Sequence, residues 1–415
     1  MAELNNIAPV TIGERIVALD LIRGIAVLGI LLANVTAFGH GDLAYYWPPA
    51  LPDGGSAADR AMWLGQFVLV DGKFRGLFTL LFGAGLVLFV ERAGADRRAL
   101  VLQVRRLGWL ALIGVAHFTL LFHGDILFAY ACGGVFAVFA LQLGAMRLLV
   151  LGVVWAAVGG ALQLLAYATP MLIELGGANG QGDAVEYYRQ FWQDRLAHDA
   201  QAGQLLAQGT YWDVLRYRII HQSGLLLSYF NYAFLETIPL MLLGMGLYRS
   251  GIFANRAVSD PWRKWAWAGL VAGLALNLAA GLLVWSRGFP PYLTQGIFFG
   301  FSNLANIPLL LGGTVLLARW AARPHGGWLA ERLVLAGRMA LSNYVGTSLV
   351  MVLVFHGWAG GLFGTLHRGE MLLVVLLGWG LMLSFSRAWL ARFSQGPLEW
   401  LWRCLTYWRW FKLKR

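Results

Sequence analysis

The chain carries ionisable residues inside segments that are otherwise apolar, and the types and spacing of some of them suit proton transfer. His117 and His123 come shortly before Asp125. A carboxylate that accepts a hydrogen bond from one imidazole nitrogen fixes the tautomer and leaves the other nitrogen free as a general base. We therefore predict that Asp125 orients one of these histidines, with His117 as the base. The alternative is a buried histidine that only satisfies a neighbouring carbonyl group.

A second set of polar residues suits the binding of phosphate groups. Arg23 follows Asp20 by three residues, and Asn34 returns to the same helix face about three turns after Arg23. Arg338 is followed one turn later by Ser342. Guanidinium and hydroxyl groups donate hydrogen bonds to phosphate oxygens. We predict that Arg23, Asn34, Arg338 and Ser342 bind a phosphorylated ligand, and the alternative is a buried ion pair that fixes helix packing.

Further polar residues outline a path between these two sets. An ionisable side chain at the centre of a membrane helix costs roughly 2.5–3.5 kcal/mol on insertion scales, so each is a functional candidate that needs a partner. For Lys73 and Arg75, extension toward the membrane surface is the alternative. The residues that we expect to line a hydrated path are Asp20, Lys73, Arg75, Glu236, Asn343 and Tyr344.

The elements that position these residues follow from the composition. The 415 residues are 59% hydrophobic and only 13% charged, which is more apolar material than one soluble core of roughly 250–300 residues can bury. Apolar runs near the roughly 20 residues that cross a bilayer predict an all-α membrane protein and exclude a soluble enzyme, a disordered chain or a strand barrel. The ten predicted spans are 16–38, 74–91, 107–122, 126–143, 148–168, 224–247, 264–286, 296–318, 333–357 and 370–390.

The charge distribution predicts the orientation of these spans. An even number of spans puts both termini on one side, and most basic residues fall in segments on that side, so both termini are expected in the cytoplasm. The net charge of +11 is then a topology signal and an attraction for anionic lipids rather than a nucleic-acid surface. Most histidines fall in the outer half, where groups that titrate near neutral pH would serve proton transfer.

The longest polar segment, 174–222, lies between the fifth and sixth spans. Its aromatic spacing predicts short amphipathic helices over the outer face, either as a solvated loop or as a lid over a site. We divide the single membrane unit into residues 1–173, the outer loop 174–222 and residues 223–415. Two cysteines are too few for a disulfide framework, and no histidine pair has the spacing of a zinc site, so no metal is expected.

Five segments resemble a known family. They are RIVALDLIRGIAVLGILLAN at 15–34, GKFRGLFTLLFGAG at 72–85, HFTLLFHGDIL at 117–127, GRMALSNY at 337–344 and GPLEWLWR at 396–403. Together they resemble the YeiB-like family of multi-pass proteins of the bacterial inner membrane. That family in turn resembles the transmembrane acyltransferase superfamily, whose members use cytoplasmic acyl-CoA to acylate glycans or lipids across a membrane.

The resemblance implies a function and also a departure. In acyltransferase family 3 the first span carries an arginine, which Arg23 matches, and then a histidine implicated in catalysis, whose position is Asn34 here. An asparagine cannot act as the base, which implies that the role either moves, with His117 as the best candidate, or is absent. An asparagine there also resembles the heparan glucosaminide acetyltransferases. The resemblance implies an acyltransferase-like half at 1–173 and a YeiB-type half at 223–415.

The expected activity is transfer of an acetyl-type group from acyl-CoA to an outer glycan, lipid or small molecule. The protein is expected to be surrounded by membrane lipids, as a monomer or an oligomer. Two alternatives remain open at this point. One is a transporter of a small amphipathic solute in which the intramembrane charges relay protons. The other is a scaffold without turnover. Binding of coenzyme A distinguishes the first reading from both.

Overall fold

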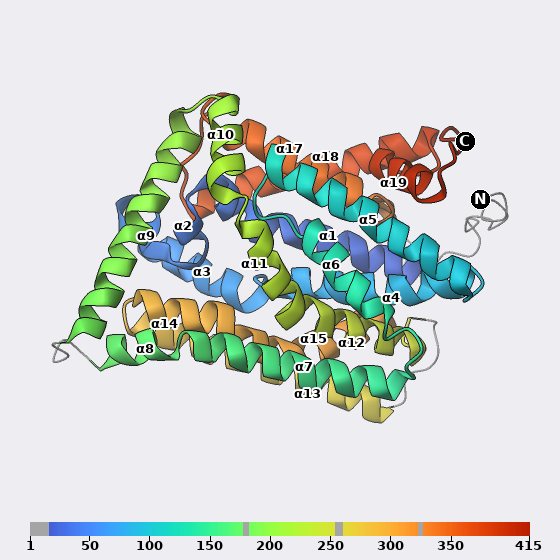
Figure 1. The fold of residues 1–415 in the computed structure, drawn as a ribbon, viewed down its shortest axis with the longest axis horizontal. Helices are drawn as coiled ribbons and strands as arrows, with labels where there is room; N and C mark the ends of the chain where they lie inside the picture. Colours follow the sequence, from blue (N-terminus) through green and yellow to red (C-terminus); the bar gives the residue numbers. More distant parts are fainter. Residues whose placement is uncertain (1–15, 177–181, 254–259, 323–326) are drawn as a thin grey trace.

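The computed structural model describes residues 16–176, 182–253, 260–322 and 327–415, and these parts of the chain are almost entirely helical. Most of the helices run along the long axis of the molecule (Figure 1). The α-helices are α1 (Val17–Gly39), α2 (Asp42–Tyr46), α3 (Ala57–Leu69), α4 (Lys73–Arg92), α5 (Arg97–Leu120), α6 (Leu127–Val138), α7 (Ala145–Ala166), α8 (Ala168–Leu175), α9 (Asp183–Gln208), α10 (Tyr211–Tyr217), α11 (Leu225–Tyr232), α12 (Ile238–Arg249), α13 (Asp260–Ser286), α14 (Pro291–Gln295), α15 (Ser302–Ala321), α16 (Trp328–Arg338), α17 (Ala340–Phe355), α18 (Arg368–Arg392) and α19 (Pro397–Tyr407). Short 3-10 turns at Pro48–Ala50 and Pro52–Gly54, and π-helical turns at Arg218–Gln222, Ala233–Thr237 and Gly296–Phe301, complete the set.

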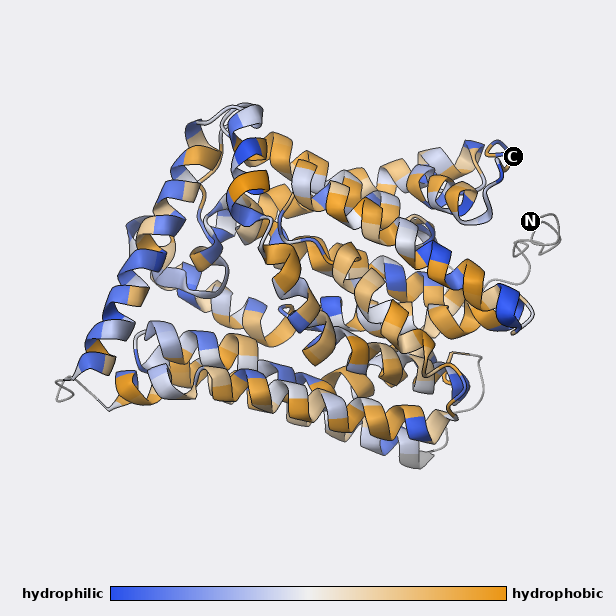
Figure 2. Cartoon of the chain, in the orientation of Figure 1, coloured by the Kyte–Doolittle hydropathy of each residue, from blue (hydrophilic) through white to orange (hydrophobic). Residues whose placement is uncertain are grey.

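The described helices confirm an all-α, multi-pass membrane protein. Eight helical runs among the described residues are long and apolar enough to cross a membrane, and a ninth is added if the bent pair α16–α17 counts as one span. Apolar residues predominate along the helices of the bundle, whereas α9 is largely hydrophilic (Figure 2). The protein therefore offers apolar surface along the bundle and a polar helix at one end.

Two of the ten predicted spans differ from straight membrane helices. The prediction at 126–143 corresponds to α6, whose 12 residues reach only about 18 Å, against a hydrocarbon core of about 30 Å. The prediction at 333–357 corresponds to α16 and α17, which meet at an angle of 90° around Met339. The predicted span at 74–91 is extended instead, because α3 and α4 together form a run of 36 residues, Ala57–Arg92.

Close helix packing depends on glycines at the points where backbones meet. A Cβ atom on Gly337 of α16 would come within 1.8 Å of the carbonyl oxygen of Asp20 on α1, and one on Gly244 of α12 within 1.8 Å of the carbonyl oxygen of Leu80 on α4. Membrane helices lack a hydrophobic drive to associate in lipid, so small residues that allow close contact take its place. These two contacts hold α1 against α16 and α4 against α12.

The segment predicted to form helices over one face does so. In Figure 1, α9 crosses one end of the bundle, the end opposite α19. It is one helix of 26 residues followed by the short α10, rather than several short helices. Asp199 on α9 accepts a hydrogen bond from the backbone N–H of Leu43 at 3.2 Å, and the Trp192 ring meets Trp47 with centroids 5.1 Å apart. These contacts anchor α9 to the end of the bundle.

Candidate functional site

An elongated cavity of about 350 Å³ lies between α1, α4, α5, α6, α16–α17 and α19. Its lining runs from Ile16 to Ile30 on α1 and from Phe78 to Arg92 on α4. At 1.5 Å per residue, either stretch measures about 20 Å. The two helices run in opposite directions, since Gly29 on α1 lies beside Phe74 and the Arg23 guanidinium lies beside Gly85. The cavity is therefore long and narrow and follows the bundle axis.

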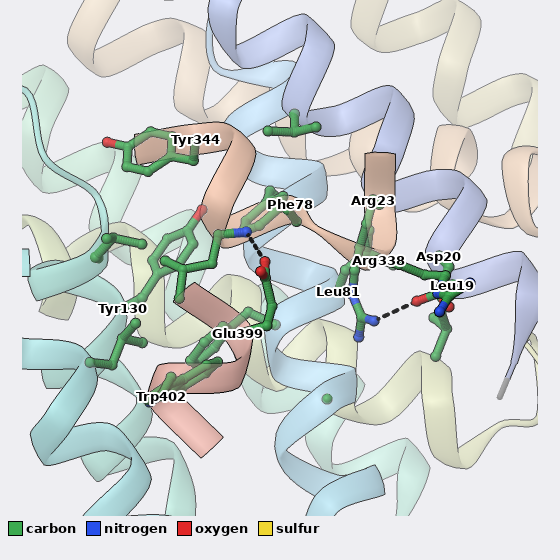
Figure 3. A pocket seen from close by; sticks show the side chains of 18 of the residues that line it. Leu19, Asp20, Arg23, Phe78, Leu81, Tyr130, Arg338, Tyr344, Glu399 and Trp402 are labelled. Carbon is green, nitrogen blue, oxygen red and sulfur yellow. Dashed lines mark hydrogen bonds and ion pairs between the residues drawn. The ribbon is translucent and has the colours of Figure 1, made fainter. Parts of the chain in front are cut away.

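One end of this cavity is charged. Arg23 donates a hydrogen bond from Nη1 to Asp20 Oδ1 at 3.1 Å, as their positions three residues apart predicted. The Arg106 guanidinium stacks over the Trp402 ring at 4.3 Å. Figure 3 shows Asp20 and Arg23 on one side of the pocket and Trp402 and Glu399 on another. The charged residues that line this end are Asp20, Arg23, Arg92, Arg106, Arg338 and Glu399, so cations outnumber anions.

Glu399 caps the start of α17 at this charged end. Its carboxylate accepts hydrogen bonds from the backbone N–H groups of Leu341 at 2.8 Å and Ser342 at 3.1 Å, and from the Ser342 hydroxyl. The first N–H groups of a helix have no partner within the helix, so an acceptor from α19 satisfies them. Burial raises the pKa of Glu399, which makes protonation easier when an anion approaches. Ser342 thus lies behind Glu399 and supports it.

The other end of the cavity is apolar except for tyrosine hydroxyl groups. Val27, Ile30 and Phe78 line it together with Tyr130 and Tyr344. The Tyr130 hydroxyl accepts a hydrogen bond from the Thr79 hydroxyl at 2.8 Å and donates one to the Arg75 carbonyl oxygen at 3.2 Å. Tyr344 lies beyond Tyr130 on the same side of the pocket (Figure 3).

His117 and Asp125 form a buried pair directly behind Tyr344. The His117 and Tyr344 ring centroids are 4.9 Å apart, and His117 Nδ1 lies 2.9 Å from Asp125 Oδ1. Asp125 Oδ2 also accepts a hydrogen bond from the backbone N–H of Phe128 at 2.7 Å. A carboxylate at Asp125 can only accept, so this contact favours the tautomer with the proton on Nδ1. Nε2 of His117 is buried and has no hydrogen-bond partner among the described residues, which leaves its lone pair available as a base.

Local sequence explains how this pair is held. A Cβ atom on Gly114 would lie 2.4 Å from the Phe128 nitrogen and 2.9 Å from Asp125 Oδ2, so only glycine leaves room for the carboxylate against α5. The Tyr344 hydroxyl accepts a hydrogen bond from the Ile126 N–H at 3.3 Å and so fixes the connection between α5 and α6. Along α5, His117 lies eleven residues beyond Arg106, about 16 Å further from the charged end.

Asn34 does not line the cavity but lies on the corresponding face of α1. It comes one turn after Ile30, which lines the apolar end. One turn further, the Phe38 ring stacks on Phe122 with centroids 3.9 Å apart. Residues at these intervals share a helix face, so Asn34 is on the side of α1 that faces the connection between α5 and α6. It is half-buried there.

Glu236 and Arg75 form an ion pair next to this end. Arg75 Nη2 lies 2.6 Å from Glu236 Oε1, and the Tyr232 hydroxyl donates to the same oxygen at 3.1 Å. Glu236 sits in the π-helical turn Ala233–Thr237, a local widening that is often found at functional sites. Hydrogen bonds through Tyr130 connect the backbone of Arg75 to the cavity wall.

The comparisons with known proteins agree with the resemblance noted in the sequence. A family model described as "Protein of unknown function (DUF418)" matches residues 247–409. The "Uncharacterized protein YeiB" of Escherichia coli (strain K12) is 32% identical over 405 residues, which cover 95% of this chain and 96% of that protein. The chain belongs to the YeiB family. The "Uncharacterized protein YxaH" of Bacillus subtilis (strain 168) is 28% identical over 423 residues and covers 98% of each chain. No solved structure matches.

In this YeiB-family chain the cavity joins the matched region to the rest of the molecule. Arg338, Tyr344 and Glu399 lie within residues 247–409. Arg23 lies outside that region and lines the cavity, and His117 also lies outside it, behind Tyr344. The site is therefore composed of both halves of the chain.

Two sequence predictions need correction in this YeiB-family fold. His123 does not share Asp125 with His117, because its Nε2 lies 2.8 Å from Asp42 Oδ1 on α2. Lys73 does not line the cavity either. The turn between α3 and α4 buries it, and its Nζ donates hydrogen bonds to the Phe67 carbonyl oxygen at 2.5 Å and to Asn277 Oδ1 at 3.2 Å.

Two further expectations are also wrong. Asn343 does not line the path, because its amide donates hydrogen bonds to the Ala336 carbonyl oxygen at 3.0 Å and the Ser386 hydroxyl at 2.9 Å, which packs α17 on α18. The outer histidines do not all titrate near neutral pH. Burial lowers the pKa of His356 to about 4 and also lowers the pKa of His40. These two imidazoles are neutral at physiological pH.

Some residues of the cavity were expected from sequence only as members of a group, and others were missed. Arg92 and Arg106 belong to the arginines between the second and third predicted spans, which were expected as topology signals and as a basic surface suited to phosphates, and their helices carry them to the cavity wall. Glu399 and Trp402 lie in the segment 396–403 that carries the family resemblance, which was the available signal. Nothing in the sequence indicated that Tyr130 would line the cavity. Among the described residues, no cluster of three or more histidine, cysteine or acidic side chains is placed to hold a metal ion.

Proposed function

We propose that the protein transfers an acyl group of acetyl type from coenzyme A to a hydroxyl or amine of an acceptor at the opposite membrane face. One observation carries the proposal. A single narrow cavity has several guanidinium groups at one end and, at the other, lies one tyrosine ring away from a buried histidine with a free Nε2. Coenzyme A has the same two parts, a phosphate-rich head and a long thin arm that ends in the reactive thioester.

The donor would bind with its phosphates at the charged end. Arg23, Arg92, Arg106 and Arg338 surround the space there, and guanidinium groups bind phosphate oxygens through paired hydrogen bonds. The pantetheine arm would extend along α1 and α4 toward Tyr344. The cavity length of about 20 Å suits an extended arm, so the thioester would reach the histidine end.

The chemistry would then use His117 as the general base. With the Tyr344 ring that separates it from the cavity turned aside, Nε2 would take the proton of the acceptor hydroxyl or amine while the acceptor oxygen or nitrogen attacks the thioester carbonyl carbon. The carbon–sulfur bond breaks when the tetrahedral intermediate collapses, and the imidazolium returns the proton to the departing thiolate. Asp125 holds the reactive tautomer and stabilises the imidazolium. Asn34, one turn beyond the cavity lining on the same face of α1, would donate a hydrogen bond to the developing oxyanion.

The orientation follows from the same proposal. The charged end lies where α1 begins and α19 lies, because Ile16 and Trp402 both line it. We place this end in the cytoplasm of a bacterium, where acyl-CoA is made, with the chain in the inner membrane. The predominance of basic residues in segments on the terminus side supports this orientation.

Binding of coenzyme A to the purified chain tests the proposal. We expect saturable binding that weakens as salt is added, because salt screens contacts to phosphate. Arg106→Gln should weaken binding about tenfold or more, whereas Arg97→Gln, an exposed residue of the same helix outside the cavity lining, should not. No binding to the wild-type chain, or equal loss in both variants, contradicts the assignment.

Acyl transfer tests the histidine separately. Membrane vesicles with labelled acetyl-CoA on the cytoplasmic side should transfer label to material at the other face. His117→Ala should abolish transfer while coenzyme A still binds. Undiminished transfer would remove His117 from the mechanism, and the absence of both binding and transfer would favour the transporter reading, in which the intramembrane charges relay protons.

A further inference from the structure

A second hollow lies between α4, α13 and α15 and holds about 570 Å³. It is separate from the cavity described above. On α4, Phe74 and Leu77 line this groove, whereas Phe78 and Leu81 line the cavity. Half of the residues that line it are leucine, and polar groups are confined to a few positions. The proposal that follows does not depend on the proposed acyl transfer.

The groove has the length of the hydrocarbon in one membrane leaflet. Along α15 its lining runs from Leu309 to Trp320, a distance of about 16 Å. Half of a hydrocarbon core of about 30 Å is about 15 Å. The inner end, marked by Lys73, lies near the middle of the 36-residue run Ala57–Arg92. The other end lies where α15 ends.

That other end is cationic and aromatic. Arg263 and Arg319 line it together with Trp267 and Trp320, and the two tryptophan side chains are 54% and 40% exposed. Tryptophan is enriched at membrane interfaces, where one part of the ring is apolar and another is hydrated. Ala318 and Ala321 belong to the same core cluster as Leu19 on α1, so this end lies on the same side of the molecule as the charged end of the cavity.

An unsatisfied polar group lies in the wall of the groove. Thr314 is one of the lining residues, and its hydroxyl is buried and has no hydrogen-bond partner among the described residues. A buried hydroxyl without a partner costs free energy and requires an explanation. Thr314 lies about 7 Å deeper than Arg319 along the helix. The ester carbonyl groups of a phospholipid lie at about that depth below its phosphate and would accept this hydrogen bond.

We propose that the groove binds one anionic phospholipid from the leaflet on the side of the termini. Its phosphate and acidic headgroup lie between Arg263 and Arg319, an ester carbonyl accepts from Thr314, and an acyl chain follows α15 toward Lys73. Three features match this ligand. The arginines at one end are opposite in charge to its headgroup, the apolar wall has the length of one leaflet, and the Thr314 hydroxyl between them needs an acceptor. Basic pockets between membrane helices bind acidic lipid headgroups in this way.

Native mass spectrometry of the full chain in detergent tests the proposal, with phosphatidylglycerol and phosphatidylcholine of the same acyl chains as probes. The wild-type chain should retain phosphatidylglycerol at least tenfold more strongly. The double variant Arg263→Gln, Arg319→Gln should lose this preference, whereas Arg97→Gln, Arg392→Gln, which removes equal charge from exposed sites, should keep it.

A second variant tests the apolar part. Gly313 lines the groove, and the nearest atom to an added Cβ is a Leu270 methyl at 3.8 Å, so Gly313→Leu should fold and fill the space. It should lower retention of both lipids at this site, while Gly346→Leu, where nothing lies within 4 Å, should not. Equal retention of both lipids by the wild-type chain would overturn the proposal. Displacement of the lipid by inorganic phosphate alone would also overturn the proposal, because the apolar groove would then contribute nothing to binding.

Discussion

Replacement of Asp125 by asparagine is the sharpest perturbation that the structure offers. Asp125 Oδ2 accepts a hydrogen bond from the Phe128 N–H at 2.7 Å, and Oδ1 faces His117 Nδ1 at 2.9 Å. In Asp125→Asn the amide oxygen must stay toward the Phe128 N–H, because that donor has to be satisfied. The amide NH₂ then faces His117 and forces Nδ1 to accept. The imidazole proton moves to Nε2, and the lone pair of the proposed base is lost.

The size of the effect follows from the role. A positioned general base contributes typically 10²- to 10⁴-fold to a rate, which corresponds to about 2.7–5.4 kcal/mol of barrier at 1.36 kcal/mol per tenfold. The change in folding stability should be much smaller, about 1 kcal/mol, because one neutral hydrogen bond replaces one charged bond at nearly the same geometry. A large loss of transfer with little loss of melting temperature therefore separates a catalytic role from a packing role.

Two assays check this reasoning. Transfer of label from acetyl-CoA in vesicles should fall by the factor above. Nitrogen-15 spectroscopy of labelled imidazoles, with His117→Gln to assign the signal, should show a proton on Nδ1 of His117 in the wild-type chain and on Nε2 in Asp125→Asn. Wild-type transfer by Asp125→Asn would refute the base assignment. An unchanged tautomer would refute the argument about the amide even if transfer fell.

Three further results are expected. Gly337→Ala should lower the melting temperature in detergent by the equivalent of about 1–3 kcal/mol because its Cβ meets backbone at 1.8 Å, whereas Gly346→Ala, in open space, should be neutral or slightly stabilising. Asp59 raises the pKa of His367; their contact therefore stabilises fully below about pH 6.5 and is lost as pH rises through the raised pKa. The melting temperature of the wild-type chain relative to His367→Asn should accordingly fall between pH 6 and pH 9, and a constant difference would contradict this. Glu236→Gln removes the anion from the 2.6 Å ion pair with Arg75 and should lower the free energy of unfolding by about 1–3 kcal/mol. This is less than for a fully buried pair because the arginine is partly exposed. An unchanged melting temperature would show that the pair contributes little.

Local chemistry explains which parts of the site the sequence could predict. Asp20 and Arg23 are three residues apart on one helix, and His117 and Asp125 flank a short connection, so both pairs follow from helix geometry and chain distance alone. The membrane helices were equally predictable, because a long continuous apolar segment in hydrocarbon satisfies its own backbone hydrogen bonds only as a helix. These features require no knowledge of how distant segments pack.

Features that depend on packing between distant segments could not be predicted. Arg106 and Glu399 meet at the cavity because α5 packs against α19 across most of the chain length. His123 turned to Asp42 because α2 folds back over the end of α1, and nothing near His123 in sequence indicates this contact. The 90° bend between α16 and α17 occurs at Met339, which is neither proline nor glycine, so the residue type did not predict it.

The shortness of α6 has a consequence for the surrounding bilayer. A helix of about 18 Å leaves a deficit of about 12 Å relative to the hydrocarbon core, and a membrane compensates such a mismatch by thinning or by admitting water beside the short element. The thinned region would border the connection that holds Asp125. Turnover should then respond to the acyl chain length of the host lipids, being faster in vesicles of short-chain lipid and slower in thick ones. Such a dependence would make bilayer thickness a physical regulator of the reaction.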